Sequence, residues 1–194
     1  VLPDRVRPAE EDAAARAFAK ALADDETVRE HWQERIAAWE AFVAEHAGTE
    51  WAVRADARAK ELRLDAEADA EKRLADLVGA AGGRTALLAT RLEEFAEHRR
   101  NKGTRAAAAA RERAGALRAE HLARIKGIAA RAEELARGGD FAAARDQLGA
   151  ADEHLLPESV VLLDAARAAI RDVEARWKGE GDRWQALEDA ARAA

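Results

Sequence analysis

The sequence predicts an all-α protein, either an elongated antiparallel helical bundle or a set of stacked helical hairpins with long, alanine-rich helices. Alanine, arginine, glutamate and leucine make up most of the 194 residues, and all four are strong helix formers. Only 3 prolines are present and β-branched residues are scarce, so the chain has little material for strands. Because alanine buries little apolar area, the core must be thin and must draw its stability from many close helix contacts.

The first helices follow from apolar residues at helical spacing between turn residues. Pro8 can begin a helix that runs to about Ala23. Thr27 and Glu30 form a capping-box pattern, which predicts that a second helix begins there and runs to Gly48.

Three further long helices and two short ones are predicted. Thr49 caps a long helix that ends near the glycine pair at 82–83. A short helix then ends near His98, and Thr104 begins another long helix that ends at the glycine pair 138–139. The last pair is a short helix over 140–154 and a long one from Glu158 to about Lys178.

This order of a short helix followed by a long helix indicates an internal repeat of roughly 52 to 56 residues. Gly83 and His98 have the same separation as Gly139 and His154. Such a repeat predicts stacked hairpins that pack on their neighbours. The alternative is that sequences rich in alanine, glutamate, arginine and leucine match themselves at many offsets.

The expected organisation is one continuous helical array with N-terminal helices over 1–48, a long-helix hairpin region over 49–139 and a C-terminal hairpin over 140–194. The run KGIAARAEELARGGDFAAARDQL, followed by LLP and a helix that ends in RWK, covers residues 126–178. This stretch resembles the bacterial helical-repeat domain of unknown function number 349. The resemblance implies a helical-repeat architecture and no activity.

Catalytic and metal-binding patterns are scarce, so we expect no enzyme activity and no cofactor. The chain has no cysteine, and no histidine is placed by sequence to activate Ser159, which is the one serine. The glycine-rich runs lack the lysine and the preceding strand of a phosphate-binding loop.

The five histidines each follow a glutamate, but adjacent side chains on a helix point about 100° apart and do not chelate one ion well. Only Glu94 and His98 have workable helical spacing. His46, His98 and His154 are better explained as residues at helix C-termini that interact with free carbonyls. A third class of function, a metal-storing or oxidising bundle, would need Glu-x-x-His motifs that are not present.

A carboxylate stripe at four-residue steps lies on the first long helix and comprises Glu61, Asp65 and Asp69. We interpret this stripe as a solvated face or a set of salt-bridge partners. No apolar run is long enough to span a membrane, and residues 1–12 lack the apolar core of a secretory signal. We therefore expect a cytoplasmic protein. Because the chain starts with valine and contains no methionine, we interpret it as a processed product, an alternative start or an excised fragment.

The most informative functional feature is a basic segment, residues 99–126, within a chain of net charge −6. It carries two glutamates and nine cations: Arg99, Arg100, Lys102, Arg105, Arg111, Arg113, Arg118, Arg124 and Lys126. One interpretation is a phosphate-binding face for nucleic acid. The other, which we favour, is pairing with acidic residues on neighbouring helices such as the first long helix, because several arginines border the apolar face. Interleaved aromatic residues, which stack on single-stranded bases, are missing.

Tryptophans lie near both ends of the chain. Trp32, Trp39 and Trp51 can fill a core, whereas Trp177 and Trp184 are our candidates for a protein docking surface. The sequence thus predicts a non-enzymatic helical-repeat scaffold or adaptor that binds a protein partner through helical faces. The alternative is a nucleic-acid-associated protein that uses the basic segment. The oligomeric state stays open.

Overall fold

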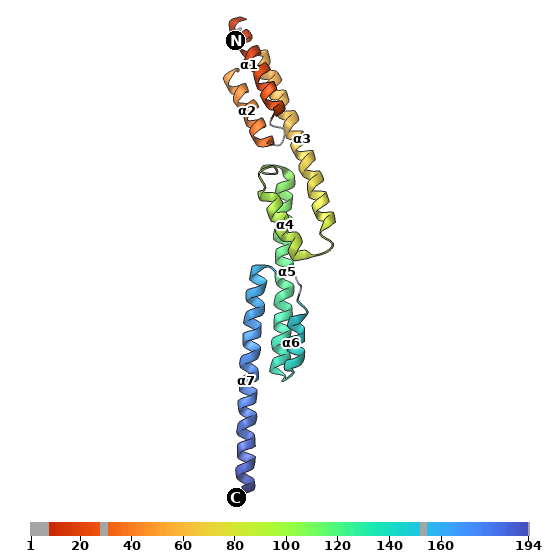
Figure 1. Ribbon diagram of the computed structural model, residues 1–194, viewed down its shortest axis with the longest axis vertical. Coiled ribbons are helices and arrows are strands. Elements are labelled where there is room, and N and C mark those ends of the chain that lie inside the picture. Colours follow the sequence, from red (N-terminus) through yellow and green to blue (C-terminus); the bar gives the residue numbers. More distant parts are fainter. Residues whose placement is uncertain (1–7, 28–30, 152–154, 194) are drawn as a thin grey trace, which may run out of the picture. The chain divides into compact units, whose positions relative to one another are not determined.

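A computed structural model describes residues 8–27, 31–151 and 155–193, and in these residues the fold is all-α, as predicted. The described part of the chain forms seven helices and no strand (Figure 1). The helices are α1 (Pro8–Thr27), α2 (Trp32–Glu45), α3 (Glu50–Ala80), α4 (Thr85–Glu97), α5 (Arg105–Arg137), α6 (Phe141–Gly149) and α7 (Pro157–Ala193). Within the described residues, no helix combines the length and the apolar character needed to cross a membrane.

The chain divides into two compact units, and α4 and α5 contribute residues to both. Unit 1 comprises residues 1–80 and 91–112, and unit 2 comprises 81–90 and 113–194.

In unit 1, the helices α1 and α2 pack against α3. The face of α3 in this core consists mainly of alanines with one large residue, Leu62, which is fully buried. Small side chains on α3 leave room for the aromatic residues of the other two helices. Trp39 of α2 is buried against Phe18 of α1, with 5.2 Å between the ring centroids, and Phe18 also lies 5.2 Å from the ring of Trp51 at the start of α3. The thin alanine-lined core that composition predicts is thus completed by aromatic rings.

The predicted start of the second helix is wrong. Thr27 is the last residue of α1, and α2 begins at Trp32 after His31, whose side chain makes no capping hydrogen bond. Glu30, the other half of the expected capping box, lies outside the described residues. The first helix continues past Ala23 because Asp25, in its last two turns, is buried between two arginines of α2 and α3.

The turns before α3 and α5 are built in the same way, and each long helix starts at its predicted threonine. Thr49 Oγ1 accepts a hydrogen bond from the Ala52 N–H (3.1 Å) and donates one to the His46 carbonyl (2.7 Å). Thr104 Oγ1 likewise accepts from the Ala107 N–H (3.1 Å). Each hydroxyl satisfies one of the free N–H groups at a helix N-terminus.

In unit 2, the core is formed by the second half of α5, by α6 and by the first half of α7. Ile125, Leu148, Leu163 and Ile170 are buried there, and alanines fill the space between them. Asp140 caps α6 by accepting a hydrogen bond from the Ala143 N–H at 3.0 Å, at the predicted start of that short helix.

Two predicted helix ends in unit 2 are wrong. The short helix α6 ends at Gly149 instead of His154, and residues 152–154 lie outside the described part. The long helix α7 continues past Lys178 to Ala193. Gly179 and Gly181 follow the predicted end, but an interior glycine costs only about 1 kcal/mol relative to alanine, and strong helix formers follow both.

Gly139, at the turn between α5 and α6, is required by both its conformation and its neighbour. Its φ is 85°, in the left-handed region that favours glycine. A Cβ atom there would lie 3.0 Å from Cη2 of Trp177 on α7. The predicted glycine-pair turn is therefore also a packing site for that tryptophan.

Candidate interaction surfaces

The strongest candidate for a binding surface is one face of the second half of α7. Leu163, Ala166 and Ile170 are buried on this face of the helix within unit 2. At helical spacing the same face continues through Trp177, Trp184 and Leu187. These three side chains, which we call the α7 face, are 51%, 70% and 62% exposed. Every residue from 175 to 192 is exposed.

The α7 face begins at the edge of the core of unit 2. The Trp177 ring meets Phe141 of α6 edge to face, with 6.1 Å between ring centroids, and it lies over Gly139. Beyond Trp177, the hydrogen bond from Gln185 to Asp189 and the ion pair between Arg192 and Glu188 stay within α7. The apolar stripe thus continues where the helices that cover its first half have ended.

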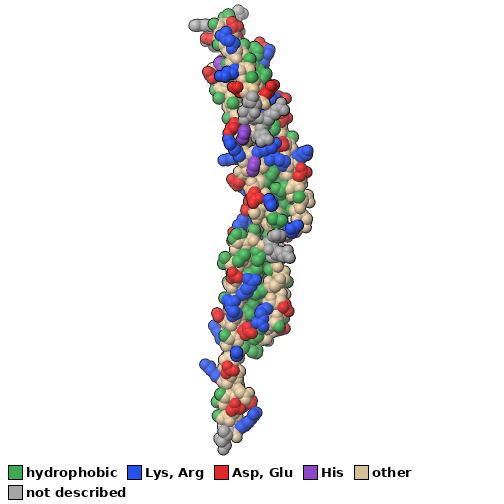
Figure 2. All heavy atoms as spheres, in the orientation of Figure 1, with side chains coloured by type: hydrophobic (Ala, Val, Ile, Leu, Met, Phe, Trp, Pro, Cys, Tyr) green, Lys and Arg blue, Asp and Glu red, His purple; other side chains and the backbone are tan. Residues whose placement is uncertain are grey.

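Part of the basic segment pairs with acidic groups. Four of its cations form ion pairs with carboxylates from other elements of the same unit: Arg99 with Glu34, Arg100 with Asp69, Arg111 with Glu97, and Arg118 with Glu158. Hydrogen bonds from the arginines lower the pKa of Glu97 and of Glu158. On the face of the molecule shown in Figure 2, basic and acidic side chains lie interspersed.

The other cations of the segment have varied environments. Lys102 contributes its carbonyl oxygen to a hydrogen bond from Gln33, and the backbone N–H of Arg105 donates to Glu67 at 2.9 Å. The side chains of Arg113, Arg124 and Lys126 are exposed.

The carboxylate stripe of α3 takes part in pairing, as predicted, at two of its three positions. Glu61 accepts from Arg58, and Asp69 lies beside Arg73 and Arg100. Asp65 is exposed. In the described part of the chain, no three histidine, cysteine or acidic side chains gather where they would hold a metal ion.

The histidines at helix ends differ in detail from the prediction. His46 does cap α2, but through its backbone N–H, which donates to the Phe42 carbonyl at 3.0 Å. The ring of His98 accepts a hydrogen bond from the Arg100 N–H at Nδ1. It therefore acts as an acceptor in the turn after α4 and not as a donor to helix carbonyls. His154 lies outside the described residues.

Two buried polar side chains in unit 2 were not singled out as core residues by sequence reasoning. His121 and Ser159 are 1% and 0% exposed, and neither side chain has a hydrogen-bond partner in the described structure. Burial, with a smaller effect from the charge of Arg124, lowers the pKa of His121. The sequence did indicate the burial of His121, because His121 lies four residues before Ile125 and so on the same face of α5.

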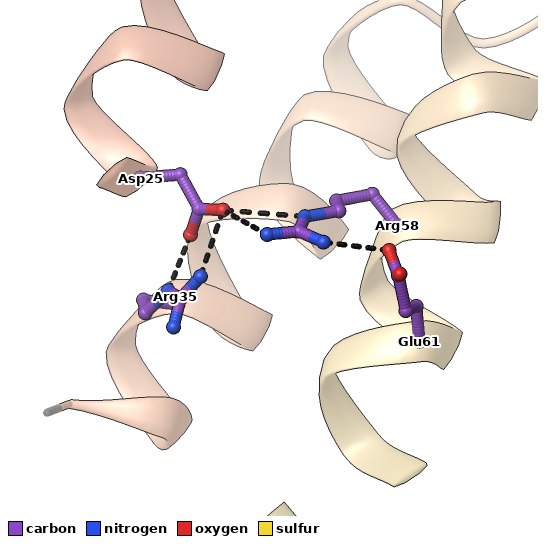
Figure 3. A network of polar contacts seen from close by, with 4 residues as sticks. All are labelled: Asp25, Arg35, Arg58 and Glu61. Carbon is purple, nitrogen blue, oxygen red and sulfur yellow. Dashed lines mark hydrogen bonds and ion pairs between the residues drawn. The ribbon is translucent and has the colours of Figure 1, made fainter. Parts of the chain in front are cut away.

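A second polar cluster joins α1, α2 and α3 in unit 1 (Figure 3). The Asp25 side chain is 3% exposed and accepts hydrogen bonds from Arg35 at 2.5 and 3.0 Å and from Arg58 at 3.0 and 3.3 Å. Arg58 also donates to Glu61 at 2.6 Å. Burial by itself would raise the pKa of Asp25, but the hydrogen bonds and charges of the two arginines outweigh it and hold the pKa below its ordinary value. A small hollow of about 290 Å³ lies beside Asp25 and Arg35. Because these two side chains already pair with each other, we interpret the hollow as a feature of helix packing and not as a ligand site.

No protein-family model matches the chain, and no curated protein or solved structure is significantly similar to it. The resemblance of residues 126–178 to the bacterial helical-repeat domain therefore stays a prediction.

Proposed function

We propose that the chain is a non-enzymatic helical scaffold or adaptor of the cytoplasm that binds a protein partner through the α7 face. The observation that carries this proposal is the continuation of one apolar stripe from a covered half of α7 into an exposed half. Exposed tryptophans at helical spacing are costly to leave in water and are enriched at the centres of protein interfaces.

The expected partner presents an apolar stripe on one or two helices. The first half of the stripe is covered by α5 and α6 of the chain itself, through alanines and a few larger residues. Helices of the same kind would extend this packing along Trp184 and Leu187. Buried tryptophans each cover roughly 150–250 Å² in such contacts.

Affinity capture with charged variants tests the proposal. Trp184→Asp and Leu187→Asp place a carboxylate on the α7 face, whereas Ala186→Asp places the same charge off this face, about 160° around the helix from Trp184 and about 100° from Leu187. Captured proteins are quantified from cells that make the chain, with folding of each variant checked by circular dichroism. A partner that is retained by Ala186→Asp and lost from the other two supports the proposal. Equal recovery with all three variants contradicts it.

The alternative is a nucleic-acid-associated protein, favoured by the exposed side chains of Arg105, Arg113 and Lys126 on α5. Because phosphate contacts release counterions, such binding weakens steeply with salt. Duplex and single-stranded DNA are titrated at two salt concentrations. Affinity that is present at low salt and falls when all three cations are changed to alanine supports this function, and no binding at low salt rules it out.

A further inference from the structure

A basic cavity of about 460 Å³ lies in unit 1, and no residue of the α7 face lines it. Its walls are residues 31–34 at the start of α2, Arg73 of α3, and the turn after α4 with His98, Arg99 and Arg100. This volume is within the range of small-molecule sites, roughly 300–1,000 Å³.

Positive charge is in excess around this cavity. The guanidinium groups of Arg73 and Arg100 share one carboxylate, that of Asp69, whose Oδ2 lies 3.1 and 3.2 Å from their Nε atoms. The third arginine, Arg99, pairs with Glu34. Three guanidinium groups thus face two carboxylates among the described residues.

Hydrogen-bond donors are also in excess. Trp32 Nε1, Arg73 Nε and Arg100 Nε are buried and make no hydrogen bond within the described chain. Both arginine Nε atoms point toward Asp69 Oδ2, but neither N–H is aligned well enough to form a hydrogen bond with it. Asp69 Oδ2 therefore also has no hydrogen-bond partner. Buried donors in proteins nearly always have an acceptor, so each such group calls for an explanation. The two arginine Nε atoms already face a carboxylate oxygen, so the donor left to explain is the Trp32 indole N–H, and an acceptor-rich ligand in the cavity supplies its acceptor.

From this convergence we infer that the cavity binds the phosphate group of a small phosphorylated ligand. A phosphate dianion offers several acceptor oxygens, and the planar guanidinium fork matches its geometry with paired hydrogen bonds. Arg73 and Arg100 hold the group from α3 and from the turn, and the indole N–H of Trp32 donates from α2. The space beyond the phosphate takes the remainder of the ligand.

The test is a titration with inorganic phosphate followed by ¹H–¹⁵N spectra, in which the Trp32 indole signal reports on the cavity. Sodium chloride at the same ionic strength is the blank. The expected result is a saturable shift of the Trp32 signal with phosphate, at least tenfold weaker binding for Arg100→Gln, and weaker binding for Arg99→Gln. Arg63→Gln is the matched control, because Arg63 is also an exposed arginine of unit 1 paired with a glutamate, Glu40, but it lies outside the cavity wall.

Arg99 is 67% exposed, so Arg99→Gln keeps the test decisive if Arg100→Gln does not fold, which circular dichroism reports. The inference is overturned if chloride shifts the Trp32 signal as phosphate does. It is also overturned if Arg63→Gln weakens binding as much as Arg99→Gln. The result is independent of the α7 face, since no residue of α7 lines the cavity.

Discussion

Replacing Asp25 with alanine should be the most destabilising single change in the polar clusters of unit 1. The substitution leaves the guanidinium groups of Arg35 and Arg58 without the carboxylate that joins them (Figure 3). Arg35 is 8% exposed and cannot recover much hydration, whereas Arg58 is 28% exposed and recovers some. Removing one partner of a buried ion pair costs about 3–5 kcal/mol, and the partial exposure of Arg58 places the expected loss near the lower value.

Glu61→Ala is the matched control for this substitution. Glu61 accepts from the same Arg58 at 2.6 Å, but its side chain is 61% exposed. Exposed ion pairs contribute about 0–1 kcal/mol, so Glu61→Ala should cost less than about 1 kcal/mol. Urea denaturation at pH 7 measures the free energy of unfolding of both variants. A loss for Asp25→Ala no larger than that for Glu61→Ala would show that the buried carboxylate does not stabilise unit 1 more than an exposed one.

The same network predicts an acid-sensitive stability. Because the folded state lowers the pKa of Asp25, the unfolded chain takes up the proton first as the pH falls. The contribution of Asp25 to the free energy of unfolding is fully present above the ordinary carboxyl pKa. It is lost as the pH falls through the lowered pKa of Asp25 in the folded state. Below about pH 4, the free energy of unfolding should therefore change less with pH in Asp25→Ala than in the native chain.

Two further predictions concern unit 2. His121 is buried with a lowered pKa, so the unfolded state protonates first and the stability of unit 2 should fall by up to about 1.4 kcal/mol per pH unit below about pH 6.5. Thermal melts from pH 7.5 to 5.5 test this: His121→Leu should remove the dependence, and an unchanged pH profile in that variant would contradict it. Gly139→Ala should destabilise by more than about 1 kcal/mol, because the φ of 85° is strained for alanine and the new Cβ meets Trp177. Gly127→Ala, in open space on α5, should stabilise by up to about 1 kcal/mol, and equal melting shifts for the two glycine variants would count against this account.

Local sequence signals predicted much of the helix framework. The all-α class followed from composition, and Thr49, Thr104 and Asp140 each cap the helix they were expected to open. These predictions succeed because a capping side chain acts on N–H groups two or three residues away and needs no tertiary contact. The sequence also predicted that arginines of the basic segment pair with acidic residues of the first long helix, and the ion pair between Arg100 and Asp69 is of this type.

The failures have tertiary causes. Thr27 has the residue type of an N-cap, but α1 continues through it because Asp25 is fixed by arginines ten or more positions away. The end of α7 is the exception, because its extension through Gly179 and Gly181 follows from the small cost of an interior glycine, about 1 kcal/mol. The basic cavity was not predicted, because it requires Trp32, Arg73 and Arg100 to be brought together from three separate elements.

The central claim is that the exposed half of α7 is a protein-binding surface. The most direct measurement places a photoreactive amino acid at Leu187, or at Ala186, about 100° around the helix and off the α7 face, in cells that make the chain. Irradiation should give a discrete cross-linked protein adduct from position 187 and little from position 186. If position 187 gives no adduct, or if both positions give the same products in equal yield, the α7 face is not the binding surface.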